Sequence, residues 1–288
     1  MTPAATTRPR LRAALVGLAL ALASCPAAGP APDAPAGPAT RVVSLAPALT
    51  ATLVELGAAD RLVGVTRYCD APGVQVVGDL EPRLEVVVAQ RPDLVVMGEY
   101  GSQSGAAEKL RALGLHVRTW PLVTLADMRR ATLALGGLVA RDEAARALER
   151  RLGDALAALA KAGEGRRAVR VLIVYDVQPG FVLTTGGGDH VSELVALGGG
   201  VNVASPGPVT ARLGLEEVVA RAPELVLHVA PDPRFPDDAA ALSYWRALLP
   251  AMPAEAVRVW PDDRLARNGP HLAEVAPRLA ALLRDARR

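Results

Sequence analysis

Cysteine is scarce in this chain of 288 residues, which contains only Cys25 and Cys69. Cys25 directly follows the predicted leader, residues 1–24, and we expect it to carry a lipid. Cys69 then has no partner for an intrachain disulfide, so stability must come from core packing. The expected folded part, 40–288, has about 250 residues, enough for two modest lobes with their own cores.

Aromatic residues make up only 3% of the chain, and the net charge is +2. Without a basic stripe or a row of aromatic side chains, a nucleic-acid partner is not expected. Catalytic motifs are missing as well, since there is no G-x-S-x-G elbow and no Walker loop. Residues 101–105 read GSQSG, with glutamine where an elbow needs serine. The sequence therefore argues against an enzyme.

The amino terminus resembles a bacterial lipoprotein signal. Arg8, Arg10 and Arg12 precede an apolar run over 13–23, which is too short to span a bilayer as a mature helix. The junction Leu22-Ala23-Ser24-Cys25 is similar to a lipobox, in which cleavage precedes an acylated cysteine. We expect residues 1–24 to be the signal and Cys25 the lipidated residue; an ordinary secretory signal is the alternative.

Residues 25–39 consist of little but Pro, Ala and Gly, a composition that cannot bury enough apolar surface to fold. We interpret this segment as a tether. The binding domain is then expected over 40–288, divided into a first lobe (40–123), linking helices (124–165) and a second lobe (166–288).

One phrase of thirteen residues occurs twice, about 130 residues apart. Residues 84–96 read LEVVVAQRPDLVV, and residues 215–227 read LEEVVARAPELVL. Each copy predicts a short helix that opens on a carboxylate, ends before proline and leads into a buried strand. A second shared phrase, LVELG at 53–57 and LVALG at 194–198, lies upstream of each copy. Two copies in the same order indicate two similar lobes rather than a solenoid.

Apolar runs bounded by Gly, Pro or Asp predict buried strands that alternate with helices, which is typical of parallel sheets with helices on both faces. The expected fold class is α/β, with two Rossmann-like lobes joined by one long backbone helix. The predicted strands are 42–45, 62–65, 94–97 and 117–120 in the first lobe, and 169–175, 181–183, 225–229 and 257–260 in the second.

Two helices are predicted between the lobes. Thr124 and Asp127 form a box-like start for the first. The second runs from Asp142 to about 162, with leucines at 148, 152, 156 and 159 on one face. We expect this leucine stripe to pack against the lobes and the long helix to resist bending.

Several phrases resemble the helical-backbone (class III) substrate-binding proteins of bacterial ABC importers, which bind cobalamin, haem or ferric siderophores. They include RVVSLAPALT at 41–50, VGVTRYCDAP at 63–72, TTGGG at 184–188 and RNGPH at 267–271, where His271 replaces the usual arginine. The likeness covers essentially all of 40–288.

In that family, one glutamate per lobe docks on arginine pockets of the two permease subunits. By motif these are Glu85 and Glu216, with Glu217 as a rival neighbour. Two exposed carboxylates can form charge-assisted pairs with a two-fold receptor and set its register. The alternative is that each simply favours its helix dipole.

Ligands of open α/β sheets bind where strands end and loops begin. Those loops carry Pro47, Tyr68 and Tyr100. Tyr68 aligns with a tyrosine that packs on the ligand in cobalamin-binding relatives, although it can instead cover the sheet edge. Tyr100 is the weaker candidate of the two tyrosines.

In the second lobe, Gly186 and Gly187 are expected to let the backbone approach a bulky ligand. We expect Asp189 to cap the next helix through Glu193. His190, a conceivable iron or cobalt ligand, is interpreted as a surface residue. Arg267 can bind an anionic group or form a surface ion pair, and helical spacing places Trp245 in the core.

A receptor for a bare metal ion such as zinc needs three or four converging ligands, whereas His116, His190, His228 and His271 are scattered. The prediction is therefore an exported, lipid-anchored and monomeric receptor at a bacterial membrane, facing the periplasm or the cell exterior. It has no intrinsic cofactor. Its partners are a metal chelate, with a corrinoid ahead of a ferric siderophore or haem, and an importer permease dimer with its ATPase.

Overall fold

The computed structural model describes residues 37–99 and 103–287. The predicted signal, most of the tether, Cys25 and Tyr100 lie outside these residues. Ala39, within the described part, is buried and donates its backbone N–H to the carbonyl of Leu138.

The first lobe is built on one five-stranded parallel sheet in the order β3-β2-β1-β4-β5. Its strands are β1 (Val42–Ser44), β2 (Leu62–Thr66), β3 (Val76–Gly78), β4 (Leu94–Gly98) and β5 (Val117–Trp120). Four of these strands confirm the predicted runs, and β3 was not predicted. β1 and β4 are buried along their whole length, as expected for strands covered on both faces.

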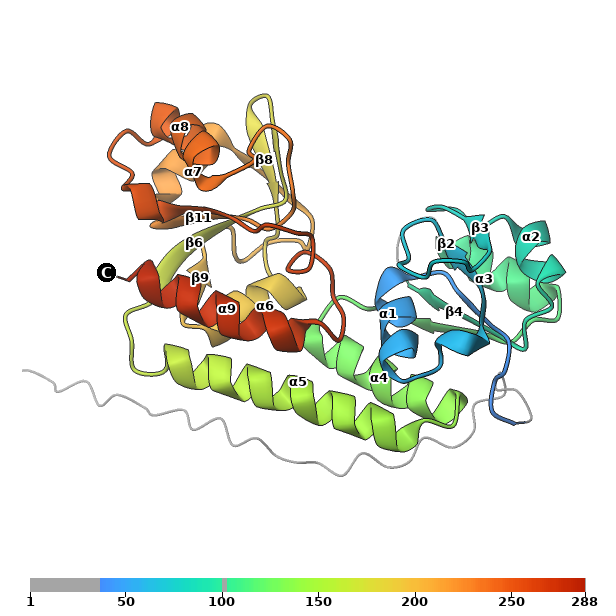
Figure 1. Ribbon diagram of the computed structural model, residues 1–288. Helices are drawn as coiled ribbons and strands as arrows, with labels where there is room; N and C mark the ends of the chain where they lie inside the picture. Colours follow the sequence, from blue (N-terminus) through green and yellow to red (C-terminus); the bar gives the residue numbers. More distant parts are fainter. Residues whose placement is uncertain (1–36, 100–102, 288) are drawn as a thin grey trace, which may run out of the picture. The chain divides into compact units, whose positions relative to one another are not determined.

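Helices cover both faces of this sheet (Figure 1). One face packs on α1 (Pro47–Glu55) and α4 (Leu125–Leu138), and the other on α2 (Leu84–Ala89) and α3 (Gln103–Ala112). A short 3-10 turn, η1 (Ala59–Arg61), precedes β2.

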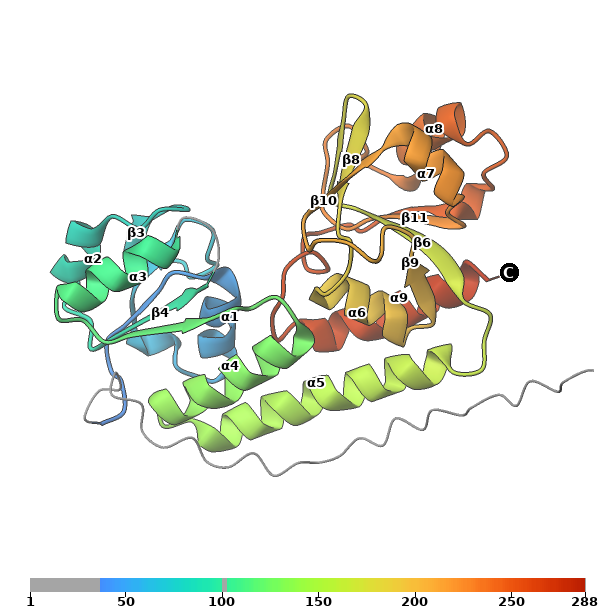
Figure 2. The ribbon, with the colours of Figure 1, turned by 180° about the vertical axis from the view of Figure 1, so that it is seen from behind.

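The second lobe has a four-stranded parallel sheet in the order β12-β11-β6-β9. The strands are β6 (Val169–Val174), β9 (Gly200–Asn202), β11 (Leu225–His228) and β12 (Val257–Val259). α6 (His190–Leu197) and α9 (Leu272–Asp285) cover one face, while α7 (Leu215–Arg221) and α8 (Asp238–Leu248) lie on the other (Figure 2). A second 3-10 turn, η2 (Ala254–Ala256), leads into β12.

One predicted strand of the second lobe is real but belongs to a different sheet. β8 (Phe181–Thr184) pairs antiparallel with β7 (Asp176–Gln178) and β10 (Ala211–Gly214). The expectation that this strand joins a parallel sheet was therefore wrong. β7 follows β6 after one residue, which is too short a connection for a parallel crossover. β7, β9 and β10 were not predicted.

The linking helices confirm the sequence prediction. Thr124 and Asp127 form a complete capping box at the start of α4. α5 (Asp142–Gly163) has 22 residues and a length of about 33 Å at 1.5 Å per residue. Its Leu148 belongs to the core of the first lobe, whereas Leu152, Leu156 and Leu159 belong to that of the second. Along this stripe, α5 contacts both α4 and α9.

The two copies of the repeated phrase lie in different sheets and in the same topological place. The first forms α2 and β4, and β4 pairs with β1; the second forms α7 and β11, and β11 pairs with β6. Each copy therefore supplies the strand beside the first strand of its own lobe.

Candidate functional site

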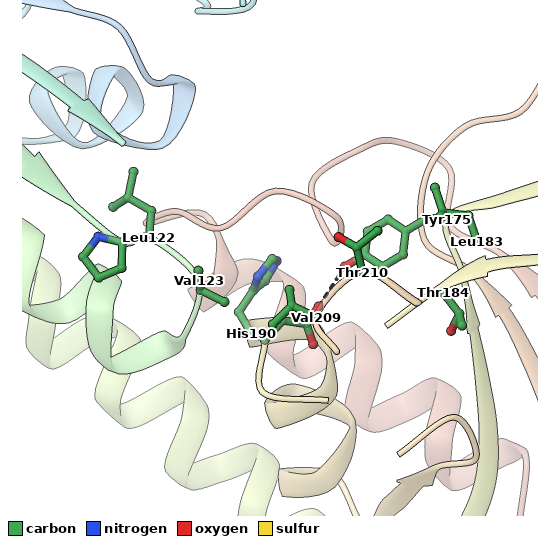
Figure 3. A pocket seen from close by; sticks show the side chains of 10 residues that line it. Leu122, Val123, Tyr175, Leu183, Thr184, His190, Val209 and Thr210 are labelled. Carbon is green, nitrogen blue, oxygen red and sulfur yellow. Dashed lines mark hydrogen bonds between the residues drawn. The ribbon is translucent and has the colours of Figure 1, made fainter. Parts of the chain in front are cut away.

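A pocket of about 330 Å³ lies where the chain leaves β5 for α4 and meets the second lobe. Figure 3 shows its side chains. Residues 121–123 line it from the first lobe. The lining residues of the second lobe are Tyr175, Leu183, Thr184, Asp189, His190, Val209 and Thr210. The wall is mostly apolar with a few polar groups, which is the usual composition of a small-molecule site.

The polar side of the pocket is organised by Tyr175 and Asp189. The Tyr175 hydroxyl donates to Asp189 Oδ2 over 3.0 Å (Figure 3), and Asp189 Oδ1 accepts from the backbone N–H of Ser192 over 2.9 Å. Burial, reinforced by the Asp189 charge, raises the pKa of Tyr175. The phenol therefore stays protonated, and one carboxylate both caps α6 and orients the ring.

The expectation for His190 was wrong, because this residue is buried. Its Nε2 lies 3.2 Å from the carbonyl oxygen of Leu265, and its backbone N–H donates to Val123 over 2.9 Å. Burial lowers the pKa of His190. Since a carbonyl can only accept, the neutral ring holds its proton on Nε2. The residue fixes the crossing segment instead of lying on the surface.

Side chains of the second lobe also fasten the segment that crosses from β5 to α4. Asn268 Nδ2 donates to the carbonyls of Leu122 and Thr124 over 3.2 and 3.0 Å. Glu193 Oε2 accepts from the backbone N–H of Leu125 over 2.7 Å. The predicted capping role of Glu193 was thus wrong, because Asp189 caps α6 without it.

The residues of the first lobe that are predicted to contact a ligand lie beyond the carboxyl ends of the parallel strands. Pro47 is the first residue of α1 and lies three residues after the end of β1, and Tyr68 lies two residues after the end of β2, the neighbour of β1. The Tyr68 side chain is 44% exposed. Neither residue lines the 330 Å³ pocket, and their contact with ligand remains a prediction.

In the second lobe, the residues predicted to contact a ligand are engaged with other residues of the same lobe. Gly186 donates its N–H to Pro208, and a Cβ at 186 would overlap the backbone of Gly207. Gly187 has φ +112°, a conformation that favours glycine. Arg267 forms an exposed ion pair with Asp263. The glycines are therefore required by the loop itself, and Arg267 already has an acidic partner.

Sequence reasoning missed Tyr175, Val209 and Thr210 as pocket residues. Tyr175 follows β6 directly, so its place after a buried strand was the available signal. No comparable signal marks 209–210, because their position depends on the antiparallel pairing of β10.

Glu85 and Glu216 occupy the same position, the second residue of α2 and of α7. Both are exposed, and within 37–99 and 103–287 neither forms an ion pair or a side-chain hydrogen bond. Glu217 pairs with Arg221 one turn further on. Of these two neighbours in α7, Glu216 is therefore the one without an ion pair among the described residues.

An arginine secures the carboxyl end of α2. Arg41 Nε donates to the Arg91 carbonyl over 3.1 Å and Arg41 Nη2 to the Gln90 carbonyl over 2.6 Å. Arg91 has φ +47°, and Asp93 accepts from the backbone N–H of Arg41 over 3.0 Å. The turn between α2 and β4 is thereby tied to the residue before β1.

The second lobe repeats this arrangement. Arg170 donates through Nε to the Ala222 carbonyl over 3.2 Å and through Nη2 to the Arg221 carbonyl. Ala222 has φ +42°, and Glu224 accepts from the backbone N–H of Arg170 over 3.0 Å. The two short helices are therefore held by equivalent contacts, far from each other in sequence.

The sequence profile of the periplasmic binding protein family matches residues 42–263. The chain belongs to this family. A vitamin B12-binding protein of Pectobacterium carotovorum is 27% identical over 252 residues, which cover 84% of this chain and 88% of the relative. A vitamin B12-binding protein of Salmonella typhi is 30% identical over 200 residues, or 66% of this chain and 72% of the relative.

Solved structures show the same fold. The periplasmic vitamin B12 binding protein of Vibrio cholerae superposes with a TM-score of 0.75 at 23% identity, covering 87% of this chain and 99% of that protein. The periplasmic heme-binding protein BhuT, in complex with two hemes, gives 0.71 at 23% identity, with 88% and 100% covered. These similarities confirm the class III resemblance and the two-lobed α/β fold.

No helix among the described residues is both long and apolar enough to cross a membrane. The same part of the chain contains no group of three or more His, Cys, Asp or Glu side chains placed to hold a metal ion.

Proposed function

We propose that this protein is the exported substrate-binding component of an ABC importer and that its ligand is a corrinoid. The observation that carries the ligand class is the match with vitamin B12-binding relatives along most of the chain, up to 84% of its length. Exposed Tyr68, at the carboxyl edge of the first sheet, supports it, because a free aromatic face suits a flat macrocycle.

The pocket beside Tyr175 contributes the second-lobe side of this site. Its volume of about 330 Å³ is at the lower end for small-molecule sites, so a macrocycle would enter it only in part. The protonated Tyr175 hydroxyl and the Asp189 carboxylate supply polar groups for the amide-bearing edge of a corrinoid. Haem or a ferric siderophore is the second candidate, favoured by the fold shared with the heme-binding protein BhuT.

Titration of the purified protein with cyanocobalamin, haemin, ferric chelates and zinc chloride tests the ligand class. We expect cobalamin alone to change the ligand absorbance and the tryptophan fluorescence, and to raise the melting temperature. Tighter binding of haemin or a ferric chelate would replace the corrinoid proposal. A thermal shift with zinc alone would indicate a receptor for bare metal ions.

Tyr68→Ala tests the site, with Leu80→Ala as its control on the same lobe, since Leu80 is also exposed. We expect the tyrosine variant to lose about tenfold in cobalamin affinity, a typical loss for an aromatic contact of about 1.4 kcal/mol. The Leu80 variant should bind like the unsubstituted protein. Equal affinities for all three proteins would place Tyr68 outside the site.

Delivery to the permease is assigned to Glu85 and Glu216, which are exposed, occupy equivalent positions and have no cationic partner within residues 37–99 and 103–287. The double variant Glu85→Ala, Glu216→Ala should abolish cobalamin uptake while ligand affinity is kept. Glu217→Ala is the matched control, because Glu217 already pairs with Arg221. Loss of ligand affinity in the double variant would assign these carboxylates to the ligand site.

Lipidation at Cys25 completes the proposal, because attached acyl chains would hold the receptor beside its permease. Cys25→Ser should release the exported protein into the soluble fraction. Continued membrane association of this variant would contradict the anchor.

A further inference from the structure

The helices that carry Glu85 and Glu216 share a second exposed feature, a valine one turn further on. Val88 is 37% exposed and Val219 is 43% exposed, whereas the preceding valines at 87 and 218 are fully buried. Residues three apart on a helix lie on the same face. Each helix thus buries one valine in its lobe and presents a carboxylate and a valine together to the outside.

The duplication is one of geometry as well as sequence. Both helices open without a side-chain cap, and each is followed within two residues by a left-handed residue whose carbonyl accepts from an arginine, Arg41 or Arg170. A helix secured at its end presents its exposed side chains in a fixed direction. A partner would therefore meet the same pair of groups, in the same relation, on each lobe.

On the second lobe, the exposed valine borders an apolar groove of about 540 Å³. Its apolar wall is formed mainly by Val219, Pro223, Leu248, Leu249, Pro250 and Met252. Glu216 stands one helical turn from this wall. The groove is large enough for an apolar side chain that enters beside a cation bound to the carboxylate.

We propose that the docking surface of each lobe is the carboxylate and valine together, Glu85 with Val88 and Glu216 with Val219. The partner that fits is a two-fold permease presenting, on each subunit, a cationic side chain beside an apolar one. On the second lobe, that apolar side chain enters the groove. This inference rests on the proposed delivery function and adds the apolar half of the contact.

The physical reason is desolvation. A carboxylate–cation pair exposed to water contributes little, whereas the same pair surrounded by apolar contacts that exclude water is stronger. Val88 and Val219 are placed to provide that exclusion. Threonine has the shape of valine and a similar helix propensity, but placing its hydroxyl against an apolar side chain of the partner is costly.

The test measures binding of the purified protein to membrane vesicles from the source bacterium, prepared from a strain that lacks this protein. The variants are Val88→Thr, Val219→Thr and the double variant. Val54→Thr and Val201→Thr are controls, because these valines are 43% and 49% exposed, one on each lobe. Cobalamin affinity and melting temperature are recorded for every protein.

We expect each docking variant to weaken vesicle binding by about fivefold and the double variant by more than tenfold. The controls should stay within about twofold, and cobalamin affinity should not change. Added salt should weaken the contribution of the glutamates but not that of the valines. Unchanged binding of the valine double variant, with binding lost in Glu85→Ala, Glu216→Ala, would overturn the apolar half alone. Binding that survives the glutamate changes, or no vesicle binding by the unsubstituted protein, would overturn the delivery function and this inference with it.

Discussion

Trp245 donates its indole N–H to Nε2 of His228 over 2.8 Å in the interior of the second lobe. An indole N–H can only donate, so His228 Nε2 carries a lone pair and the ring is the neutral tautomer protonated at Nδ1. The ring also lies 4.9 Å from that of Phe235. Burial lowers the pKa of His228 to about 4.

This pKa predicts a pH dependence of folding stability. The folded pKa lies below the ordinary value of 6.5, so between about pH 6.5 and 4 the unfolded state binds more protons. Stability should therefore fall as the pH drops through this window, by roughly 3 kcal/mol from His228. Burial also lowers the pKa of His190 and His271, which adds to the loss.

Urea unfolding at several pH values checks this dependence. His228→Gln removes the titrating group and keeps an acceptor for Trp245, so its stability should decline less between pH 6.5 and 4. An equal decline in both proteins would mean that His228 does not titrate in this window.

The Thr124 capping box should contribute measurably to the stability of α4. Thr124→Ala removes the acceptor for the Asp127 N–H and should lower the free energy of unfolding by about 1 kcal/mol. Thr124→Ser keeps the oxygen and should restore most of the difference. Chemical denaturation of the three proteins measures it, and an alanine variant as stable as the original would contradict the prediction.

The Tyr175 hydroxyl is predicted to act in ligand binding. Tyr175→Phe leaves the ring in place and should weaken cobalamin binding by about threefold to tenfold, the range of one hydrogen bond. Tyr244→Phe is the control, since that ring packs on Phe235 and Trp245 away from the pocket. Equal affinities for both variants would exclude the hydroxyl from the ligand contact.

Ligand binding should produce only a small closure. The segment between β5 and α4 is held by Asn268, Glu193 and the backbone of His190, and the stiff helix α5 is shared by two cores. Scattering profiles with and without cobalamin should nearly coincide. A large domain rotation would contradict this expectation.

Asn268→Ala tests directly whether the hydrogen bonds of Asn268 hold the segment between β5 and α4 in place. Loss of its two N–H donors removes the hydrogen bonds to the carbonyls of Leu122, which is buried, and Thr124, which is partly buried, and should cost about 2 kcal/mol of stability. It should also increase the difference between the two scattering profiles. Unchanged profiles and stability would mean that the contact is not needed.

Much of the fold was predictable from local signals. Continuous apolar runs marked β1, β2, β4 and β6, the Thr124–Asp127 spacing marked the start of α4, and the leucine stripe marked α5. These features depend on neighbours within a few residues, so periodicity and capping chemistry reveal them.

The pocket was less predictable because long-range contacts build it. β7 and β10 are strands of three and four residues, too short for a periodic sequence pattern to indicate that they pair with β8. Glu193 looked like a capping partner for Asp189, yet its acceptor oxygen is used by Leu125, 68 residues earlier. Likewise, the burial of His190 follows from Leu265 and Val123, which are distant in sequence.

The leucines of α5 have a consequence for how the molecule comes apart. In α5, Leu148 packs in the core of the first lobe, and Leu152, Leu156 and Leu159 pack in the core of the second. Unfolding of either lobe together with this helix would therefore expose part of the other lobe's core to water. Calorimetry should therefore record a single heat-absorption peak for both halves. A polar residue at position 152 should lower the temperature of that single peak and should not divide it into two.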